Sequence, residues 1–105
     1  MGELREKTEI AEELCAVFGL SVSDLSKNGG TRHLYETRRA VILFLHDNLG
    51  VSLNAIAYIF GKSNRDICYI VAKGREEMND ASKSSFKHKY GKMAEASHRF
   101  FTKLI

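Results

Sequence analysis

The feature that most constrains this chain is a stretch without a helix breaker, residues 34–49, which contains neither proline nor glycine. Within it, residues 40–45 (AVILFL) are apolar on every side, and a run of this kind alone could also be a buried strand. No breaker occurs before Gly50, however, and the whole stretch is too long for an ordinary strand. The sequence therefore predicts a buried helix over about residues 34–49, at the centre of the fold.

The remainder of the chain is also patterned for helices. It contains no proline, and no strand-like alternation of apolar and polar residues is sustained. A first helix is expected to end at Gly19, and Ser21 or Ser23 can cap a short second one before a glycine loop at residues 28–30. The apolar face of the first helix is marked by Ile10, Leu14, Val17 and Phe18. The expected fold class is all-α.

The C-terminal segment carries a stripe at helical steps of three and four residues. Its members are Phe86, Tyr90, Met93, Ser97, Phe100 and Leu104. Such a face either folds back on the core or pairs with a second copy of the chain. Because the apolar pattern of the core is already complete by Val71, a homodimer through this helix is the favoured interpretation.

Charge is distributed unevenly along the 105 residues, a length that fits one domain. Residues 1–24 have a net charge of −4, whereas residues 25–105 have a net charge of +7. A basic body of this kind is typical of a protein that faces a polyanion, although a solvated surface without a partner has the same composition. No apolar run is long enough to span a membrane, and the sequence MGELREKTEIAEEL lacks the apolar stretch of a signal peptide. We therefore expect a cytoplasmic protein.

Two short amphipathic segments meet at Gly61, within residues 52–74. Ser52 is a suitable cap for the first segment, and Ser63 with Asp66 has the spacing of a capping box for the second. The first buries Leu53, Ile56, Ala57 and Phe60, and the second buries Ile67, Ile70, Val71 and Gly74. A short glycine turn between two packed helices is typical of a helix-turn-helix, although an ordinary antiparallel helix pair has the same pattern.

Four segments, in order, resemble the C-terminal DNA-binding domain of the bacterial replication initiator DnaA: LCAVFGLSVSDL, a basic loop, ETRRAVILFL and VSLNAIAYIFG. The resemblance implies an all-helical, Trp-repressor-like fold built around a helix-turn-helix. It covers about residues 10–73, and we expect this domain to occupy residues 1–80 and an extra amphipathic helix to occupy residues 81–105. In that family the residues after the turn read the origin box in the major groove, but this chain has Ser63, Asn64 and Arg65 there. A different set of donors implies a different target sequence.

We expect ten residues to contact DNA: Lys27, Arg32, Arg38, Ser52, Lys62, Ser63, Asn64, Arg65, Tyr69 and Lys73. Asn64, Arg65 and Tyr69, with Lys73 nearby, begin the face of the second helix that would meet base edges in the major groove. The two serines place backbone amides at helix starts, where phosphate oxygens bind. The resemblance implies that Arg38 reaches the minor groove, with Lys27 and Arg32 in the basic loop before it. The alternative for Arg38 is that it only solvates the start of a buried helix.

The sequence offers little for catalysis or metal binding. The four histidines have no metal-ligand spacing, the two cysteines have no partner spacing, and no pattern pairs a nucleophile with a base. We therefore expect no enzyme activity, no cofactor, no metal and no small-molecule substrate. The expected function is sequence-preferring binding of double-stranded DNA in replication or transcription. The alternatives are a protein-interaction module that kept the fold and lost DNA binding, and binding of RNA or single strands through the basic tail.

Overall fold

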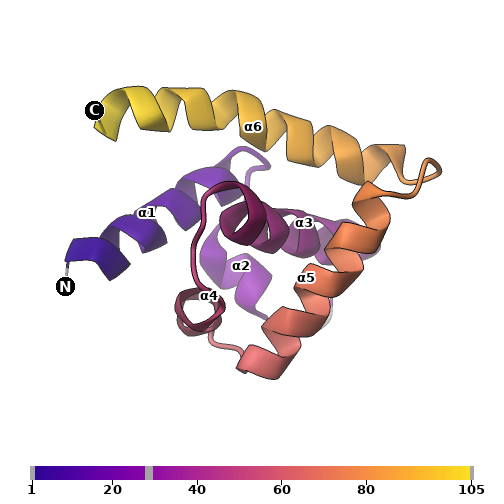
Figure 1. The fold of residues 1–105 in the computed structure, drawn as a ribbon, viewed down its shortest axis with the longest axis horizontal. Coiled ribbons are helices and arrows are strands. Elements are labelled where there is room, and N and C mark those ends of the chain that lie inside the picture. The colour runs from indigo at the N-terminus through magenta and orange to yellow at the C-terminus, as the bar shows by residue number, and fades with distance from the viewer. Residues whose placement is uncertain (1, 28–29, 105) are drawn as a thin grey trace.

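The computed structural model describes the backbone of residues 2–27 and 30–104 and the side chains of residues 6–27 and 30–97. These residues form helices joined by short connections, with no strand among them, so the predicted all-α class is confirmed (Figure 1). In chain order the elements are α1 (Gly2–Ala16), α2 (Val22–Ser26), α3 (Arg32–Leu43), η1 (Phe44–Asn48), α4 (Leu53–Phe60), α5 (Asn64–Met78) and α6 (Ser84–Leu104). No helix in the described part of the chain is both long and apolar enough to cross a membrane.

The predicted central helix is α3 together with its continuation η1. It begins at Arg32, where the Thr31 hydroxyl caps it by accepting a hydrogen bond from the N–H of Leu34. Every residue from position 40 to position 45 is buried, as the apolar run predicted. The last turn, Phe44–Asn48, is a π-helix, which the sequence analysis did not predict. Its backbone hydrogen bonds join residues five positions apart, one more than in an α-helix. One example is the 3.2 Å bond from the N–H of Leu49 to the carbonyl of Phe44.

The other helices pack around this centre. Figure 1 shows α3 in the middle of the molecule, with α1 and α2 on one side, α5 on the other and α6 running across the top. The short helix α2 begins at a capping box. The Ser21 hydroxyl accepts a hydrogen bond from the N–H of Asp24, and Asp24 Oδ2 accepts one from the N–H of Ser21 at 2.9 Å. Of the two serines considered as its cap, Ser21 is therefore the one used.

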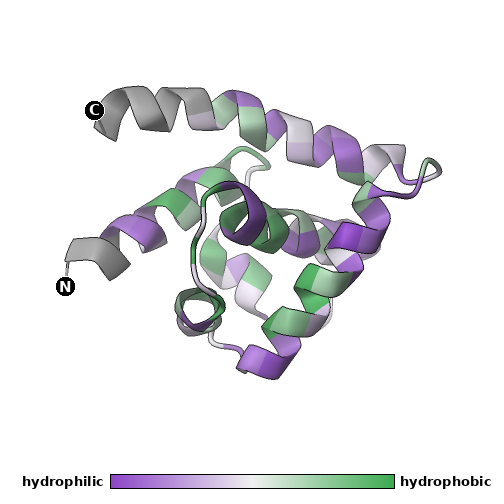
Figure 2. Cartoon of the chain, viewed as in Figure 1, coloured by the Kyte–Doolittle hydropathy of each residue, from purple (hydrophilic) through white to green (hydrophobic). Residues whose placement is uncertain are grey.

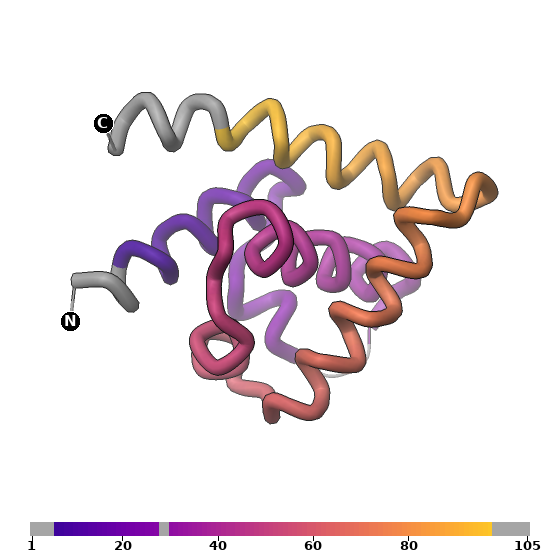
Figure 3. Tube along the Cα trace, in the orientation of Figure 1, coloured from indigo at the N-terminus to yellow at the C-terminus, as the bar shows by residue number. Residues whose placement is uncertain are grey.

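The C-terminal helix is part of the core. Figure 3 shows α6 turning back over the molecule and passing α1, and the side chains of Phe86 and Met93 are fully buried there. The Tyr90 ring meets the edge of the Phe44 ring with centroids 5.1 Å apart. The expectation that the core is complete by Val71 is therefore wrong, and the described part of the apolar stripe is covered within the protomer. The side chains of Phe100 and Leu104 lie outside the described residues, as do Asn28 and Gly29.

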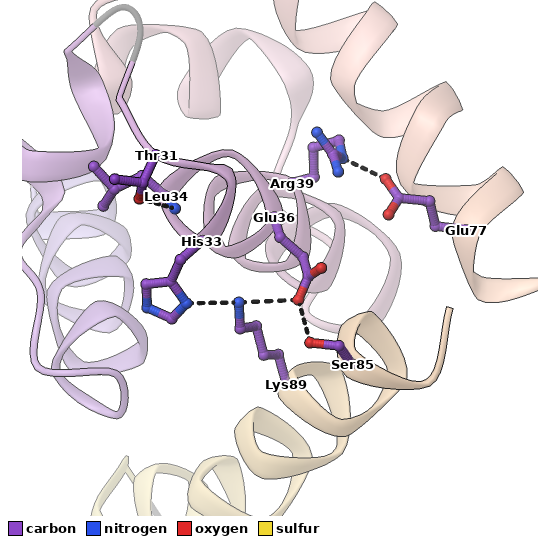
Figure 4. A network of polar contacts seen from close by, with 8 residues as sticks. All are labelled: Thr31, His33, Leu34, Glu36, Arg39, Glu77, Ser85 and Lys89. Carbon is purple, nitrogen blue, oxygen red and sulfur yellow. Dashed lines mark hydrogen bonds and ion pairs between the residues drawn. The ribbon is translucent and has the colours of Figure 1, made fainter. Parts of the chain in front are cut away.

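A polar cluster fastens α6 to α3 (Figure 4). Lys89 is buried, with 8% of the residue exposed, and its ammonium lies 3.0 Å from Glu36 Oε1 and donates to His33 Nδ1 at 3.0 Å. Ser85 Oγ also donates to Glu36 Oε1, at 2.6 Å. Burial alone raises the pKa of Glu36, but the Ser85 hydroxyl and the Lys89 ammonium together outweigh it and the pKa is lowered. The buried lysine is therefore matched by an ionised carboxylate.

The two cysteines have opposite surroundings. Cys15 is buried between α1 and the core, and Cys68 is exposed on α5. Burial, followed by the nearby charges of Glu12 and Asp24, raises the pKa of Cys15 to about 12. Both thiols are free. Cys15 is thus a core side chain.

Candidate nucleic-acid interface

The connection between α4 and α5 is the tight turn that the sequence predicted. It begins at Gly61, the residue that ends α4 with φ +62° and ψ 36°, a left-handed conformation that glycine adopts without strain. Behind it, the N–H of Lys62 donates to the carbonyl of Ala57 at 2.9 Å. Ser63 then caps α5 by accepting from the N–H of Asp66 at 3.1 Å. Residues 61–63 alone therefore connect the two packed helices.

The two faces of α5 differ as the periodicity predicted. Ile67, Val71 and Gly74 are buried against the core. The opposite face carries exposed side chains, among them Arg65, Cys68, Tyr69 (64% exposed) and Lys73. In Figure 2 the first turn of α5, at the lower end of the molecule, is hydrophilic. A polar helix end therefore projects from the fold next to the turn.

A hydrogen bond joins the first turns of α4 and α5. Asn64 Nδ2 donates to Asn54 Oδ1, and both side chains are exposed. Asn54 lies two residues after Ser52. The Ser52 hydroxyl caps α4 by accepting a hydrogen bond from the N–H of Ala55 at 3.1 Å. Asn64 was expected to face DNA by itself, and its link to Asn54 was not anticipated.

Asn54 and Tyr58 are surface residues that the sequence analysis missed. Tyr58 is 74% exposed, the highest value among the large hydrophobic side chains described. The two residues are one helical turn apart on α4, away from the buried Ile56 and Phe60. Residues four positions apart lie on the same face of a helix, and this pair falls between the buried apolar positions. That spacing could have predicted a shared exposed face.

The role expected for Arg38 does not fit its position. Its side chain is buried, with 4% of the residue exposed. Nε donates to the carbonyl of Leu25 and Nη2 to the carbonyl of Lys27, each at 2.6 Å, and the guanidinium lies 5.1 Å from the centre of the Tyr35 ring. Burial lowers the pKa of Arg38. The guanidinium is used inside the fold, where it holds the end of α2 against α3. The minor-groove contact implied by the resemblance stays a prediction that this position does not favour.

The remaining cations fall into separate places. Lys27 is exposed in the loop that Arg38 holds, whereas Arg32 lines a hollow of about 420 Å³ on the α6 side of α3, with His33 and Lys83 among its neighbours. Lys62 is half-buried, and its pKa is lowered. The main cause is burial, followed by the charge of Arg38, and together they outweigh the opposite effect of Asp66. The structure therefore does not bring Arg32 together with Lys62 and the start of α5.

Carboxylates accompany the cations along the C-terminal half of α5. Lys73 Nζ lies 3.6 Å from Glu76 Oε2, Arg39 pairs with Glu77, and Arg75 binds Asp47 through two bonds of 2.7 and 3.0 Å. Two of these pairs, Lys73–Glu76 and Arg39–Glu77, border a groove of about 660 Å³ between α3 and α5, which also contains Tyr35 and Tyr69. At the N-terminal end of α5 the cations are Lys62 and Arg65, with Asp66 beside them.

No group of three or more His, Cys, Asp or Glu side chains among the described residues is arranged to hold a metal ion. The whole chain matches no protein-family model, and none of the curated proteins matches it significantly.

Proposed function

We propose that this chain is a non-enzymatic protein that binds double-stranded DNA with sequence preference through the helix-turn-helix α4–α5. The observation that carries the proposal is the projecting N-terminal end of α5, whose first two turns expose Asn64, Arg65 and Tyr69 while the opposite face is buried. Side chains at the start of such a helix reach base edges when it enters the major groove. The first helix then crosses the backbone, where Ser52 and the amides of α4 meet phosphates.

Charge supports the same partner. The chain has a formal net charge of +3, and Lys62, Arg65 and Lys73 follow the turn and one side of α5. Phosphate contacts by such side chains supply affinity for any duplex, and contacts to base edges supply preference. A role in replication or transcription, and a relation to the DNA-binding domain of the initiator DnaA, belong to this proposal. Because Arg38 is engaged inside the fold, this mode of binding relies on α5 for sequence recognition.

A mobility-shift titration tests the proposal directly. The chain is titrated against random duplex DNA at several salt concentrations, and preferred sites are then selected from a random pool. We expect binding that weakens with salt as counterions are released, and a selected sequence that binds more tightly than the random pool. Absence of salt-dependent binding to every duplex would overturn the proposal.

A protein-interaction module remains the second candidate, and one observation favours it. Tyr58 and Tyr69 are large exposed aromatic side chains on the two helices of the motif, and tyrosine is enriched at protein interfaces. If the chain binds no duplex, substitution of these two tyrosines should instead abolish association with a protein partner.

A further inference from the structure

We propose that Asn54 and Asn64 act as one unit, in which Asn54 holds Asn64 in position to read an adenine in the major groove. This inference rests on the proposed function. It starts from the hydrogen bond between Asn64 Nδ2 and Asn54 Oδ1, which joins the first turn of α5 to the first turn of α4. Both residues are exposed, and they come from the two helices on either side of the Gly61 turn.

The chemistry of Asn64 determines which base it suits. Its amide nitrogen carries two hydrogens, and its oxygen accepts hydrogen bonds. The bond to Asn54 uses one of these hydrogens and prevents the amide group from turning over. The second hydrogen and the oxygen then form a donor and acceptor pair of fixed orientation, which matches adenine N7 and N6–H₂. Guanine presents an acceptor, O6, in place of the amino group, so the oxygen of Asn64 would face another acceptor.

Asn54 keeps a different set of groups. Its oxygen accepts from Asn64, and its amide nitrogen is a donor that this bond does not use. The residue lies in the first turn of α4, the positive end of that helix, two residues after the capping serine Ser52. A phosphate oxygen accepts hydrogen bonds and carries negative charge, so it is the complementary partner. One hydrogen bond thus links a backbone contact on α4 to a base contact on α5.

The pair is not required to hold the two helices together. The helices already share the buried side chains of Ile56, Phe60 and Ile67, whereas both asparagines are exposed to solvent. An exposed hydrogen bond between neutral amides contributes little to stability. We therefore expect Asn54→Ala and Asn64→Ala to melt close to the wild-type temperature. A defect in base preference would then report recognition and not folding.

The test begins with the site selected by the full-length protein from a random duplex pool. Affinities are measured on that duplex and on duplexes in which each A·T pair is replaced in turn by G·C. The variants are Asn54→Ala, Asn54→Asp, Asn64→Ala and the double alanine variant. Asn48→Ala is the matched control, because Asn48 is also exposed but lies at the end of η1. Thermal melts followed by circular dichroism accompany each variant.

We expect one A·T position at which replacement weakens the wild type by roughly tenfold or more. Asn64→Ala should remove this preference, and Asn54→Ala should reduce it to a few-fold while weakening binding to all duplexes. The double variant should show the base preference of Asn64→Ala, because the two residues act in series. Asn54→Asp separates the two roles: it keeps the acceptor for Asn64, and hence the preference, but its charge repels phosphate and weakens every duplex.

Two results would overturn the inference. One is an Asn54→Ala variant with the full adenine preference of the wild type. The other is a wild-type preference that Asn64→Ala leaves unchanged at every A·T position. Both leave the proposed function standing, since DNA is still bound. Absence of binding to any duplex by the wild type would overturn the proposed function, and this inference with it.

Discussion

A Cβ atom at Gly74 would lie 3.2 Å from Leu43 Cδ2 and 3.3 Å from Leu43 Cβ, so α5 and α3 approach each other through the space that glycine leaves. Leu43 is buried in the core, where it has little room to move. Gly91, in α6, is helical as well but has nothing within 4 Å of its Cβ position. These two glycines form a matched pair for testing helix packing.

Gly74→Val should lower the free energy of unfolding by about 2 kcal/mol or more, because the side chain forces α5 away from Leu43. Gly91→Ala should raise it by about 0.5–1 kcal/mol, since alanine favours the helix and meets no neighbour. Urea unfolding of both variants measures these changes. A Gly74→Val variant as stable as the wild type would contradict the close approach of the two helices.

Val41→Asp should prevent folding. Val41 is fully buried in α3, and an unpaired buried charge costs several kcal/mol, which is comparable with the whole stability of a small domain. Ser23→Asp is the control, because it adds the same charge at an exposed position near the start of α2. Circular dichroism and thermal melting should show a cooperative transition for the control alone.

Arg38→Met should destabilise the fold by about 2–4 kcal/mol, because the carbonyls of Leu25 and Lys27 lose charged donors. Arg32→Met, at an exposed position of the same helix, should change stability by less than about 0.5 kcal/mol. Urea midpoints give both values. If Arg38 were a minor-groove contact, its substitution would instead leave stability unchanged and reduce DNA affinity alone.

The Glu36 cluster predicts a pH dependence with a definite sign. The pKa of Glu36 is lowered in the folded state, so its contribution to stability is present above the unfolded pKa and is lost as pH falls through the folded one. Glu36→Gln resembles the protonated acid, and its deficit in urea midpoint relative to the wild type should be largest near neutral pH and close toward pH ~3. Glu95→Gln, which removes the same charge at an exposed site of α6, is the control. A constant deficit for Glu36→Gln would count against the ionised pairing with Lys89.

Arg65→Ala should weaken binding to the preferred site by about 1–3 kcal/mol and binding to random DNA much less, because arginine can make a paired contact to guanine. Lys62→Ala should weaken all duplexes alike and reduce the salt dependence by about one charge. Lys92→Ala, exposed on α6, should change neither. Equal losses on both kinds of DNA for Arg65→Ala would make Arg65 a phosphate contact and remove it from recognition.

Local signals in the sequence were sufficient to predict the helices. The caps at Ser21, Ser52 and Ser63 depend on residues three positions apart, and the turn at Gly61 depends on one left-handed residue. The burial of residues 40–45 could be predicted from their own apolar character, without knowing which residues contact them. Such features are encoded within one or two helical turns, which is why composition and spacing revealed them.

Contacts between distant elements could not be predicted in the same way. Arg38 binds backbone carbonyls, which every residue possesses, so no side-chain pattern identifies Leu25 and Lys27 as its partners. The helical stripe of α6 indicated burial, but not whether Phe86 meets its own core or a second copy. The π-turn of η1 follows a run that is apolar on all sides, where periodicity carries no information about register. The DNA contacts and the relation to the initiator domain stay predictions.

Because Cys15 is buried and Cys68 is exposed, a thiol reagent should label the sulfur of Cys68 alone. A reagent that attacks thiolates finds almost none at Cys15, whose pKa is raised to about 12 inside the core. The Cys68 sulfur is exposed on α5, three residues after Arg65 and directly before Tyr69. A maleimide dye would therefore attach beside the proposed recognition surface without any change to the sequence. Its fluorescence would report when that surface is covered, whatever covers it.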